Sequence, residues 1–573
     1  MKKMNIIERI ANSFLLYGGS ILGSIFRHDW IKKARKNKKR SERKLLKHIH
    51  KNRNTEYGKK YDFSSIKTMK DYQEKVPLST YEDYRPYLER MAKKKEKNLI
   101  IKKNIKAFAM TSGTTNKSKI IPHSKLSAIP FFKAFCIWTN DMVKAFKKRK
   151  IKRFNAKGFM ITEIGLNIAT DRKKEVDDSY SIGHTTAYAV GILKYFLPLV
   201  TQLPMQVFKS DEIYDMRYIK ARYALQDPSL NYFCGVFMTA LTDIIIYIED
   251  NHEMLIEDIE NGTIHPSIKI GEKTRKKLEK KLKKDPLRAQ ELREIFKTKS
   301  KTPLINRLWK NMSYVFAIGT GDFSPSTRKM RSYCEKDVVF GFVMYASSEA
   351  MMGCVMHSED PTYLLVNDDC FFEFLPVDKK VETPLLMHEL EVGSLYELII
   401  TNKTGLYRYK LGDVVRVMKY EGDTPYVQFA YRNEFITDIS ATHLTGEMVK
   451  MSIHDVEKDC KINILDYALY PNQTLRKPQL ELFVETEEKL EEKEYQKIEN
   501  CMEKALLKNS YGYKYTRDGD YIDKIKIHFL KKKTFTSYRE KKVEEGAALN
   551  QLKTVRVIRT KEQYEFFKKQ IEE

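Results

Sequence analysis

Hydroxyl side chains, a glycine and a lysine lie close together in one short segment of the sequence. The segment reads Thr-Ser-Gly-Thr-Thr-Asn-Lys-Ser-Lys, and its hydroxyls belong to Thr111, Ser112, Thr114 and Thr115. Hydroxyls and main-chain N–H groups donate hydrogen bonds, Gly113 lets the main chain approach an anion closely, and Lys119 supplies a positive charge. The segment is therefore typical of a phosphate-binding loop. Its spacing is not that of a Walker A loop, and a Ser/Thr-rich turn between strands explains the same residues.

Two further segments combine polar side chains with glycine or serine. One reads Tyr345-Ala346-Ser347-Ser348-Glu349, and the other ends in Leu411-Gly412-Asp413. An ionised carboxylate at Asp413 can accept hydrogen bonds from both hydroxyls of a sugar diol, although an Asp after a Gly also occurs in plain turns. Glu349 has a similar structural alternative, as a partner of a helix N-cap.

Strands and a helix must hold these segments in place. An apolar stretch from Ile105 to Met110 predicts a strand before the first segment, and Lys125 to Lys147 predicts a helix after it. This order places the loop at a strand-to-helix junction, where anions bind readily. Strands over 309–318 and 338–345 end at Gly319 and Ala346, which indicates adjacent carboxyl ends of one sheet, where α/β proteins bind ligands.

The rest of the chain predicts two domains. Alternating strands follow over 363–366, 371–375, 394–401 and 414–419, and further strands over 464–470, 479–484 and 525–530 accompany helices over 445–459 and 487–508. We place the boundary so that residues 1–430 form a large α/β domain with β-sheets flanked by helices, and residues 431–573 a small α+β domain. Near the start, Ser79 and Glu82 are spaced as a capping box that begins a helix.

Composition narrows the class of protein. The chain has 573 residues, which is too long for one core, and its seven scattered cysteines include no C-x-x-C pair. We therefore expect neither a disulfide framework nor a zinc site, and we expect a cytoplasmic protein that works as a monomer. The net charge of +28 raises nucleic acid or an anionic membrane as partners. No nucleic-acid-binding motif accompanies the basic runs, which are typical of solvated surfaces.

The N-terminus predicts a helix with an apolar face formed by Ile6, Ile7, Ile10 and Phe14. Glu8, Arg9 and Asn12 interrupt the pattern of a signal peptide, and the apolar run is too short to span a bilayer. We expect this helix to pack on the body of the protein or to touch a membrane surface.

Taken together, the three polar segments resemble the motifs of the GH3-type acyl acid amido synthetases of the adenylate-forming superfamily. The second and third family motifs, Y-x-S-S-E and Y-R-Y-x-x-G-D, are matched without gaps by residues 345–349 and 407–413. The likeness covers most of the chain. The departures are Asn116, where the first motif usually has Gly, Val555, where a Pro is usual, and an atypical segment after Arg432.

The resemblance implies a two-step ligase that uses ATP and Mg²⁺. A carboxylic acid is adenylated, and an amine, expected to be an amino acid, then takes the acyl group and releases AMP. In this reading the loop from Thr111 to Lys119 holds phosphates and Glu349 ligates Mg²⁺. Further nucleotide contacts are expected from Thr320, Tyr345, Ala346, Ser347, Ser348, Asp413 and Arg432. Lys553 is expected to neutralise charge where the acid meets the α-phosphate.

Two alternatives remain open. The acyl group can pass to a thiol such as coenzyme A, as in other members of the superfamily. The second alternative belongs to a different class of function: a basic protein that uses this scaffold to bind nucleic acid or lipid. The simultaneous presence of Lys119, Glu349 and Asp413 favours an enzyme, because binding alone does not require all three.

Overall fold

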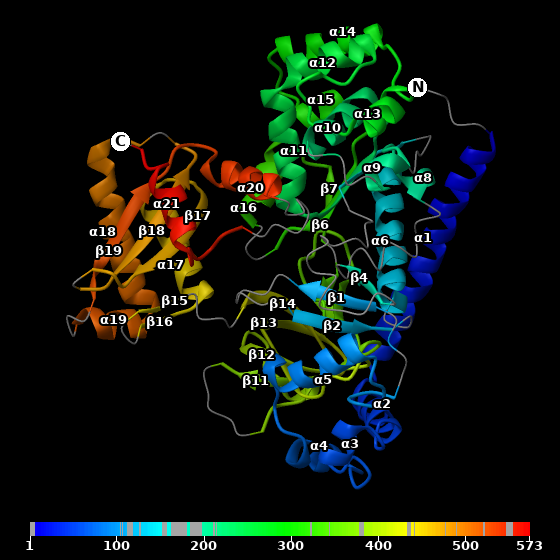
Figure 1. The fold of residues 1–573 in the computed structure, drawn as a ribbon, viewed down its shortest axis with the longest axis vertical. Coiled ribbons are helices and arrows are strands. Elements are labelled where there is room, and N and C mark those ends of the chain that lie inside the picture. The colour runs from blue at the N-terminus through cyan, green and yellow to red at the C-terminus, as the bar shows by residue number, and fades with distance from the viewer. Residues whose placement is uncertain are drawn as a thin grey trace. The chain divides into compact units, whose positions relative to one another are not determined.

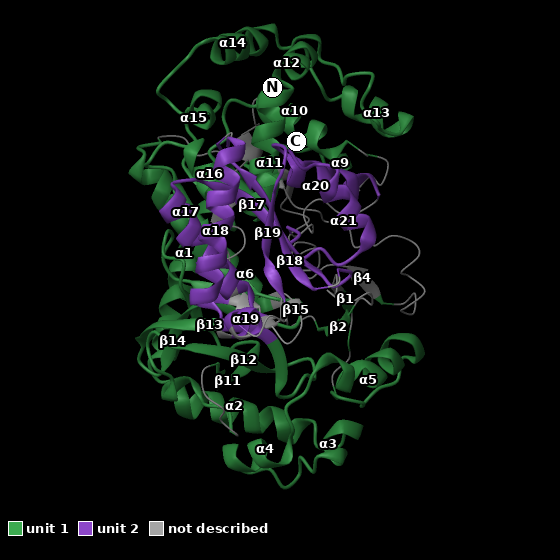
Figure 2. Ribbon diagram, turned by 90° about the vertical axis from the view of Figure 1, so that its left-hand side faces the viewer, with its two compact units in different colours: residues 1–323, 327–411, 415–428 green, residues 324–326, 412–414, 429–573 purple. Residues whose placement is uncertain are grey.

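The computed structural model describes most of the chain. The described residues are 6–102, 105, 107–111, 119–124, 128–151, 158–161, 180–183, 197–209, 213, 215–320, 324–342, 344–377, 383–432, 437–439, 442–475, 477–488, 490–518, 522–545 and 554–572. They divide into two compact units (Figure 2). The first unit contains residues 1–323, 327–411 and 415–428, and the second contains 324–326, 412–414 and 429–573.

A parallel sheet in the first unit lies between two helical layers. Its strands are β3 (Phe159–Ile161), β5 (Tyr232–Phe237), β6 (Tyr314–Ile318) and β7 (Val339–Phe342), in that order. Alternate side chains point to opposite faces, so Phe233 and Val315 pack on α10 to α15 while Tyr232 and Phe316 pack on α6. Both faces of the sheet are therefore buried, as parallel sheets require.

The helices of the first unit have the following bounds: α1 (Ile6–Ala34), α2 (Lys38–Lys51), α3 (Glu56–Lys60), α4 (Met69–Lys75), α5 (Tyr81–Lys94), α6 (Ala128–Lys148), α8 (Leu197–Val200), α9 (Met205–Lys209), α10 (Met216–Gln226), α11 (Met238–Asp250), α12 (His252–Asn261), α13 (Glu272–Glu279), α14 (Pro286–Lys297), α15 (Leu304–Leu308), α16 (Ser324–Ser332) and the 3₁₀ helix η4 (Met387–Glu389).

Two further sheets complete the first unit. A three-stranded sheet has the order β2-β1-β4, in which β1 (Ala107–Thr111) pairs antiparallel with β2 (Lys119–His123) and parallel with β4 (Ser181–Gly183). A seven-stranded sheet has the order β11-β12-β13-β14-β10-β9-β8. Its strands are β8 (Tyr345–Ala346), β9 (Met351–Val355), β10 (Tyr363–Leu365), β11 (Cys370–Pro376), β12 (Leu395–Asn402), β13 (Tyr409–Glu421) and β14 (Thr424–Arg432).

Glycine brings α1 and α6 into close contact, and the two helices run side by side (Figure 1). A Cβ atom at Gly23 would lie 2.0 Å from the Cys136 carbonyl oxygen, and one at Gly19 would lie 3.2 Å from Thr139 Cγ2. No larger residue fits at Gly23 without moving the helices apart. The Arg27 guanidinium on α1 forms a buried ion pair with Asp141 on α6.

The second unit is a small α+β body. Its main sheet has the order β17-β18-β19, with strands Ile464–Asn472, Gln479–Thr486 and Asp523–Phe529, and a hairpin joins β15 (Thr437–Ile439) to β16 (Thr442–Leu444). The helices are α17 (Gly446–Cys460), α18 (Glu492–Asn509), α19 (Tyr511–Asp518), α20 (Thr534–Glu544) and α21 (Lys561–Lys568). One apolar cluster joins α17 and α18 to the sheet, and a second joins α20 and α21 to it.

The structure corrects four local predictions. Strand β2 stands between the phosphate-loop motif and α6, so the motif connects two strands and does not open a helix. The predicted strand over 338–345 is two strands of different sheets, β7 and β8. Helix α5 is capped by Thr80 and Asp83, one residue later than predicted. Asp413 lies inside β13 and not in the turn before it.

Candidate active site

Glu349 lies in the tight turn that joins β8 to β9. Its main-chain N–H donates to Ser347 Oγ at 3.2 Å, and its carbonyl accepts from Asn402 Nδ2 at 2.7 Å. Asn402 is buried at the end of β12, and its Oδ1 also accepts from the N–H groups of Thr404 and Leu406. Because the turn is tied to a neighbouring strand, the Glu349 side chain is held in a defined place although it belongs to a short loop.

Two side chains from other strands approach Glu349. Tyr409 begins β13, and its hydroxyl lies 3.5 Å from Glu349 Oε1. His123 ends β2, is buried, and forms a hydrogen bond with the main chain of Ser348. Burial lowers the pKa of His123 to about 4, while the Ser348 hydrogen bond and the Glu349 charge partly oppose this effect. The imidazole beside Glu349 is therefore neutral at pH 7.

Thr320 and Tyr345 extend this cluster toward the parallel sheet. Thr320 is the second residue after β6, and its Oγ1 lies 3.2 Å from the hydroxyl of Tyr363 on β10. The Tyr363 ring is 5.7 Å from the Tyr345 ring, centroid to centroid. The structure thus brings Thr320, Tyr345 and the Ala346–Glu349 turn together where the parallel sheet meets the seven-stranded sheet. Hydroxyls and a carboxylate converge there, as a nucleotide site requires.

The first motif is described only at its two ends. Thr111 and Lys119 are paired across the β1–β2 ladder, and Lys119 Nζ lies 5.6 Å from the centre of the Tyr81 ring. Tyr81 also accepts the N–H of Ile120 at 2.9 Å through its hydroxyl. The predicted ligands Ser112, Gly113, Thr114 and Thr115 lie outside the described residues.

The third motif divides into structural and site-facing residues. Arg408 is buried with φ +48°, and its guanidinium contacts Glu373 at 3.1 Å and donates to the carbonyl of Val76 at 2.6 Å. Arg408 therefore anchors the segment before α5, whereas its neighbour Tyr409 reaches Glu349. Gly412 has φ +81°, a conformation that favours glycine, directly before the buried Asp413.

The remaining predicted residues are not brought to Glu349 by the described contacts. Asp413 is buried in β13 and groups with the second compact unit. Arg432 ends β14, and Lys553 lies outside the described residues. Their predicted roles stay predictions.

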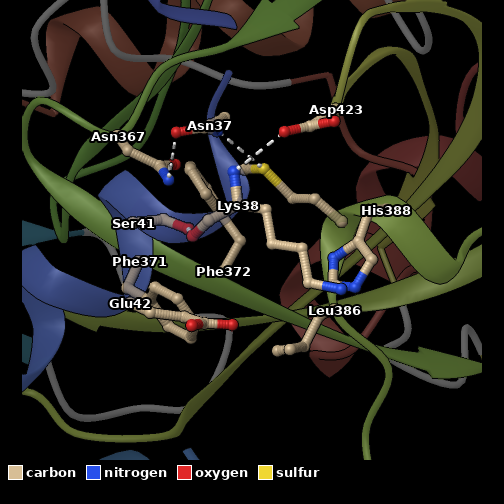
Figure 3. Close-up of a pocket in the computed structure, with 11 residues that line it drawn as sticks. Asn37, Lys38, Ser41, Glu42, Asn367, Phe371, Phe372, Leu386, His388 and Asp423 are labelled. Carbon is tan, nitrogen blue, oxygen red and sulfur yellow. Dashed lines mark hydrogen bonds between the residues drawn. The ribbon is translucent and has the colours of Figure 1, made fainter. Parts of the chain in front are cut away.

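In the described part of the chain, no group of three or more His, Cys, Asp or Glu side chains could hold a metal ion. A small pocket at the start of α2 is lined by Asn37, Lys38, His388 and Asp423, among others (Figure 3). It contains none of the predicted site residues, so it is not the candidate nucleotide site.

Sequence reasoning missed three residues of this cluster. Sequence patterns give no role to Asn402, Tyr409 and Tyr363, and nothing in the sequence distinguishes His123 from an ordinary buried or loop histidine. Tyr409 lies within the third motif, and that was the one signal that could have identified it. Asn402 is 53 residues from Glu349, which it holds, and Tyr363 lies in a strand without a motif. Only tertiary contacts reveal these residues.

Comparisons with known proteins cover nearly the whole chain. Models of the GH3 family N-terminal, central and C-terminal domains match residues 27–339, 363–432 and 447–562. Jasmonoyl–L-amino acid synthetase JAR4 of Nicotiana attenuata is 24% identical over 540 residues, covering 90% of each chain. Indole-3-acetic acid-amido synthetase GH3.10 of Arabidopsis thaliana is 23% identical over 514 residues, covering 84% of each. The fold is similar to that of the AtGH3.15 acyl acid amido synthetase in complex with 2,4-DB, with a TM-score of 0.82, 18% identity and 96% of each chain covered.

Proposed function

The chain belongs to the GH3 family, and from this premise we propose that the enzyme adenylates a carboxylic acid with ATP and joins the acyl group to the amino group of an amino acid. It is a ligase of the acyl acid amido synthetase type. The observation that carries the proposal is the match to all three family domains in order, combined with the buried Glu349 in the turn between β8 and β9.

The first step needs little from the protein beyond alignment and charge neutralisation. An oxygen of the ionised acid attacks the α-phosphorus of ATP, the bond to the bridging oxygen breaks, and pyrophosphate leaves. The nucleophile is already deprotonated, so no general base is required. Burial lowers the pKa of His123, so this neighbour of Glu349 is uncharged at pH 7 and does not form an ion pair with the carboxylate.

We assign the following roles to the site residues. The Thr111 to Lys119 loop holds the β- and γ-phosphates, and Thr320, Tyr345, Ala346, Ser347 and Ser348 line the nucleotide. Asp413 accepts the ribose hydroxyls and Arg432 steadies the same region. Glu349 ligates Mg²⁺, which neutralises phosphate charge when bound. A single buried carboxylate fits this ion, because Mg²⁺ is usually held by one or two carboxylates together with the phosphates of the substrate.

In the second step the amino group attacks the acyl carbonyl. The amide C–N bond forms, the bond from the carbonyl carbon to the phosphate oxygen breaks, AMP leaves, and the nitrogen loses a proton. Positioning of the amine against the adenylate supplies the rate advantage. The name of the relative JAR4 supports an amino acid as the acceptor, and that of GH3.10 supports an amide as the product.

The assay for the first step is exchange of labelled pyrophosphate into ATP across a panel of carboxylic acids. We expect exchange that depends on both an acid and Mg²⁺. Protein that binds ATP and exchanges with no acid in a broad panel contradicts the proposal. Product analysis with amino acids or coenzyme A as acceptor then separates amide from thioester formation.

We also propose that the enzyme is a monomer of the reducing cytoplasm. All seven cysteines are free, and burial raises the pKa of the Cys136, Cys234, Cys334 and Cys354 thiols. Thiols of this kind behave as small core residues and not as a disulfide framework. Light scattering on the purified protein tests the oligomeric state, and fractionation of source cells tests the location.

A further inference from the structure

Large apolar side chains form a stripe along one exposed face of α1. Ile10, Phe14, Ile21 and Ile25 have 65%, 77%, 63% and 54% of their surface exposed. Their spacings of four, seven and four residues place them on the same side of a helix, and Tyr17 continues the pattern. Single exposed apolar residues are common, but a contiguous stripe marks an interaction surface.

The beginning of α6 also exposes apolar side chains. The Phe26 and Phe132 rings are in edge-to-face contact with centroids 6.3 Å apart, and Phe132 and Ile129 are both exposed. Helix α6 therefore exposes two apolar side chains, one of which contacts Phe26 of α1.

The opposite face of α1 cannot turn outward to cover this surface. Gly19 and Gly23 contact α6 closely, and Arg27 is held by Asp141 and by Asn140 Oδ1 at 2.8 Å. Trp30 donates to Asp368 Oδ2 at 2.9 Å. These contacts fix the rotation of α1, so the stripe is a stable feature of the surface.

Beyond the apolar stripe, the same face of α1 carries basic side chains. His28 and Lys32 follow Ile25 at helical spacing and are exposed. Between His28 and Lys51 the sequence holds eleven Lys and Arg side chains against two Asp and Glu. Lys32, Lys36 and Lys39 are exposed, and none of them forms an ion pair with another described residue.

An apolar stripe that ends in unpaired cations is complementary to a bilayer with anionic headgroups. The apolar side chains insert among the acyl chains, and the anionic headgroups attract the lysines. Among the described helices, none is long and apolar enough to cross a membrane. A helix that lies in the plane of the interface satisfies both observations.

We propose that the exposed face of α1, from Ile10 to Lys32, docks the enzyme on the surface of an anionic lipid bilayer. Phe14, Ile21 and Ile25 enter the boundary between headgroups and acyl chains, and Lys32 and Lys36 contact the headgroups. This inference goes beyond the proposed function and does not rest on it.

The test is sedimentation of the full-length protein with vesicles of phosphatidylcholine alone or with 30% phosphatidylglycerol. We expect binding to the anionic vesicles, at least tenfold weaker binding for Phe14→Ser/Ile21→Ser, and weaker binding for Lys32→Glu/Lys36→Glu. Raised salt should weaken binding as well, because it screens the lysines. Leu287→Ser removes an exposed apolar side chain of α14 and Lys299→Glu/Lys301→Glu makes the same charge change elsewhere, so both controls should bind as the native protein does.

Other outcomes overturn the proposal. No sedimentation with either vesicle, or equal loss in the control variants, removes α1 as a membrane-docking face. Light scattering that shows a native dimer and a monomeric Phe14→Ser/Ile21→Ser variant assigns the stripe to a second copy of the chain instead. Pyrophosphate exchange and circular dichroism on every variant show whether the fold is retained.

Discussion

The residues of the motifs have different roles, and their contacts distinguish residues that support the fold from residues of the site. Arg408 pairs with Glu373 and with main-chain carbonyls, so it supports the fold. Glu349 is buried, its main chain is held by Asn402, and the Tyr409 hydroxyl lies near its carboxylate. A carboxylate fixed in this way is available to a ligand, whereas the Arg408 guanidinium is already fully engaged.

We therefore predict that Glu349→Gln impairs pyrophosphate exchange. The amide keeps the shape of the side chain but loses the negative charge that ligates Mg²⁺, so the rate should fall roughly tenfold or more and higher Mg²⁺ should partly restore it. Exchange assays over a range of Mg²⁺ concentrations measure the effect. Glu391→Gln alters an exposed carboxylate and should leave the rate unchanged. An unchanged rate for Glu349→Gln removes this residue from the site.

Elements of the first unit are held together by close helix contact and by buried charge. Helix α1 packs closely on α6 at a glycine. The Asp368 carboxylate, in the β10–β11 connection, accepts hydrogen bonds from Trp30 of α1, Lys44 of α2 and Lys133 of α6. Burial alone would raise the pKa of Asp368, but the Lys133 and Trp30 hydrogen bonds and the Lys44 charge hold it well below its usual value. Neither contact involves the side chain of a predicted site residue, so we expect their effects to appear in stability.

Substitution of the helix-contact glycine should destabilise the protein. A Cβ at Gly23 would overlap the Cys136 carbonyl, so Gly23→Ala should cost about 1–3 kcal/mol, the usual penalty for an overpacked contact. Gly18 is in the same helix with nothing within 4 Å of its Cβ position, so Gly18→Ala should be neutral or stabilise by about 0.5–1 kcal/mol. Thermal unfolding of the two variants measures the contrast, and equal shifts would refute the close-contact interpretation.

The Asp368 cluster predicts a pH dependence of stability. A carboxyl group whose pKa is lower in the folded protein stabilises the fold above its unfolded pKa of about 3.9, and this contribution is lost as the pH falls below that value. At pH 7, Asp368→Asn should lower the free energy of unfolding by about 2 kcal/mol, the scale of hydrogen bonds to charged groups. In urea unfolding, the difference from the native protein should shrink below about pH 4. A difference that persists at low pH would show that packing, and not charge, is responsible.

At the scale of the whole molecule, the predicted site residues are distributed over the two compact units of the chain. Glu349 and Lys119 belong to the first unit, and Asp413 and Arg432 belong to the second. The family resemblance implies that Lys553 neutralises charge during adenylation. A mobile ammonium can do this in the transition state without permanently occupying the site.

Lys553→Ala should therefore slow adenylate formation by roughly 10², the scale for loss of one transition-state charge contact. The same variant should still form amide from preformed acyl adenylate and amine, because the second step does not need that contact. Measurement of both half-reactions on one preparation checks this. Equal losses in the two steps would indicate misfolding or a general docking defect.

The sequence by itself determined the family, the two-step ligase activity and the fold class, and the comparisons confirm these predictions. It did so because the Ser347–Glu349 and Tyr407–Asp413 motifs are contiguous and their chemistry is local. Strands such as Tyr232–Phe237 also follow from apolar runs bounded by turns.

Only the tertiary structure decided which elements meet. Periodicity shows which face of an element is apolar, but it does not name the partner of that face. His123, Asn402 and Tyr409 therefore gather at the Ser348–Glu349 turn through contacts that span 53 residues or more along the chain, which no local pattern encodes. For the same reason, the division of 338–345 between two sheets and the glycine contact of α1 with α6 became visible only in three dimensions.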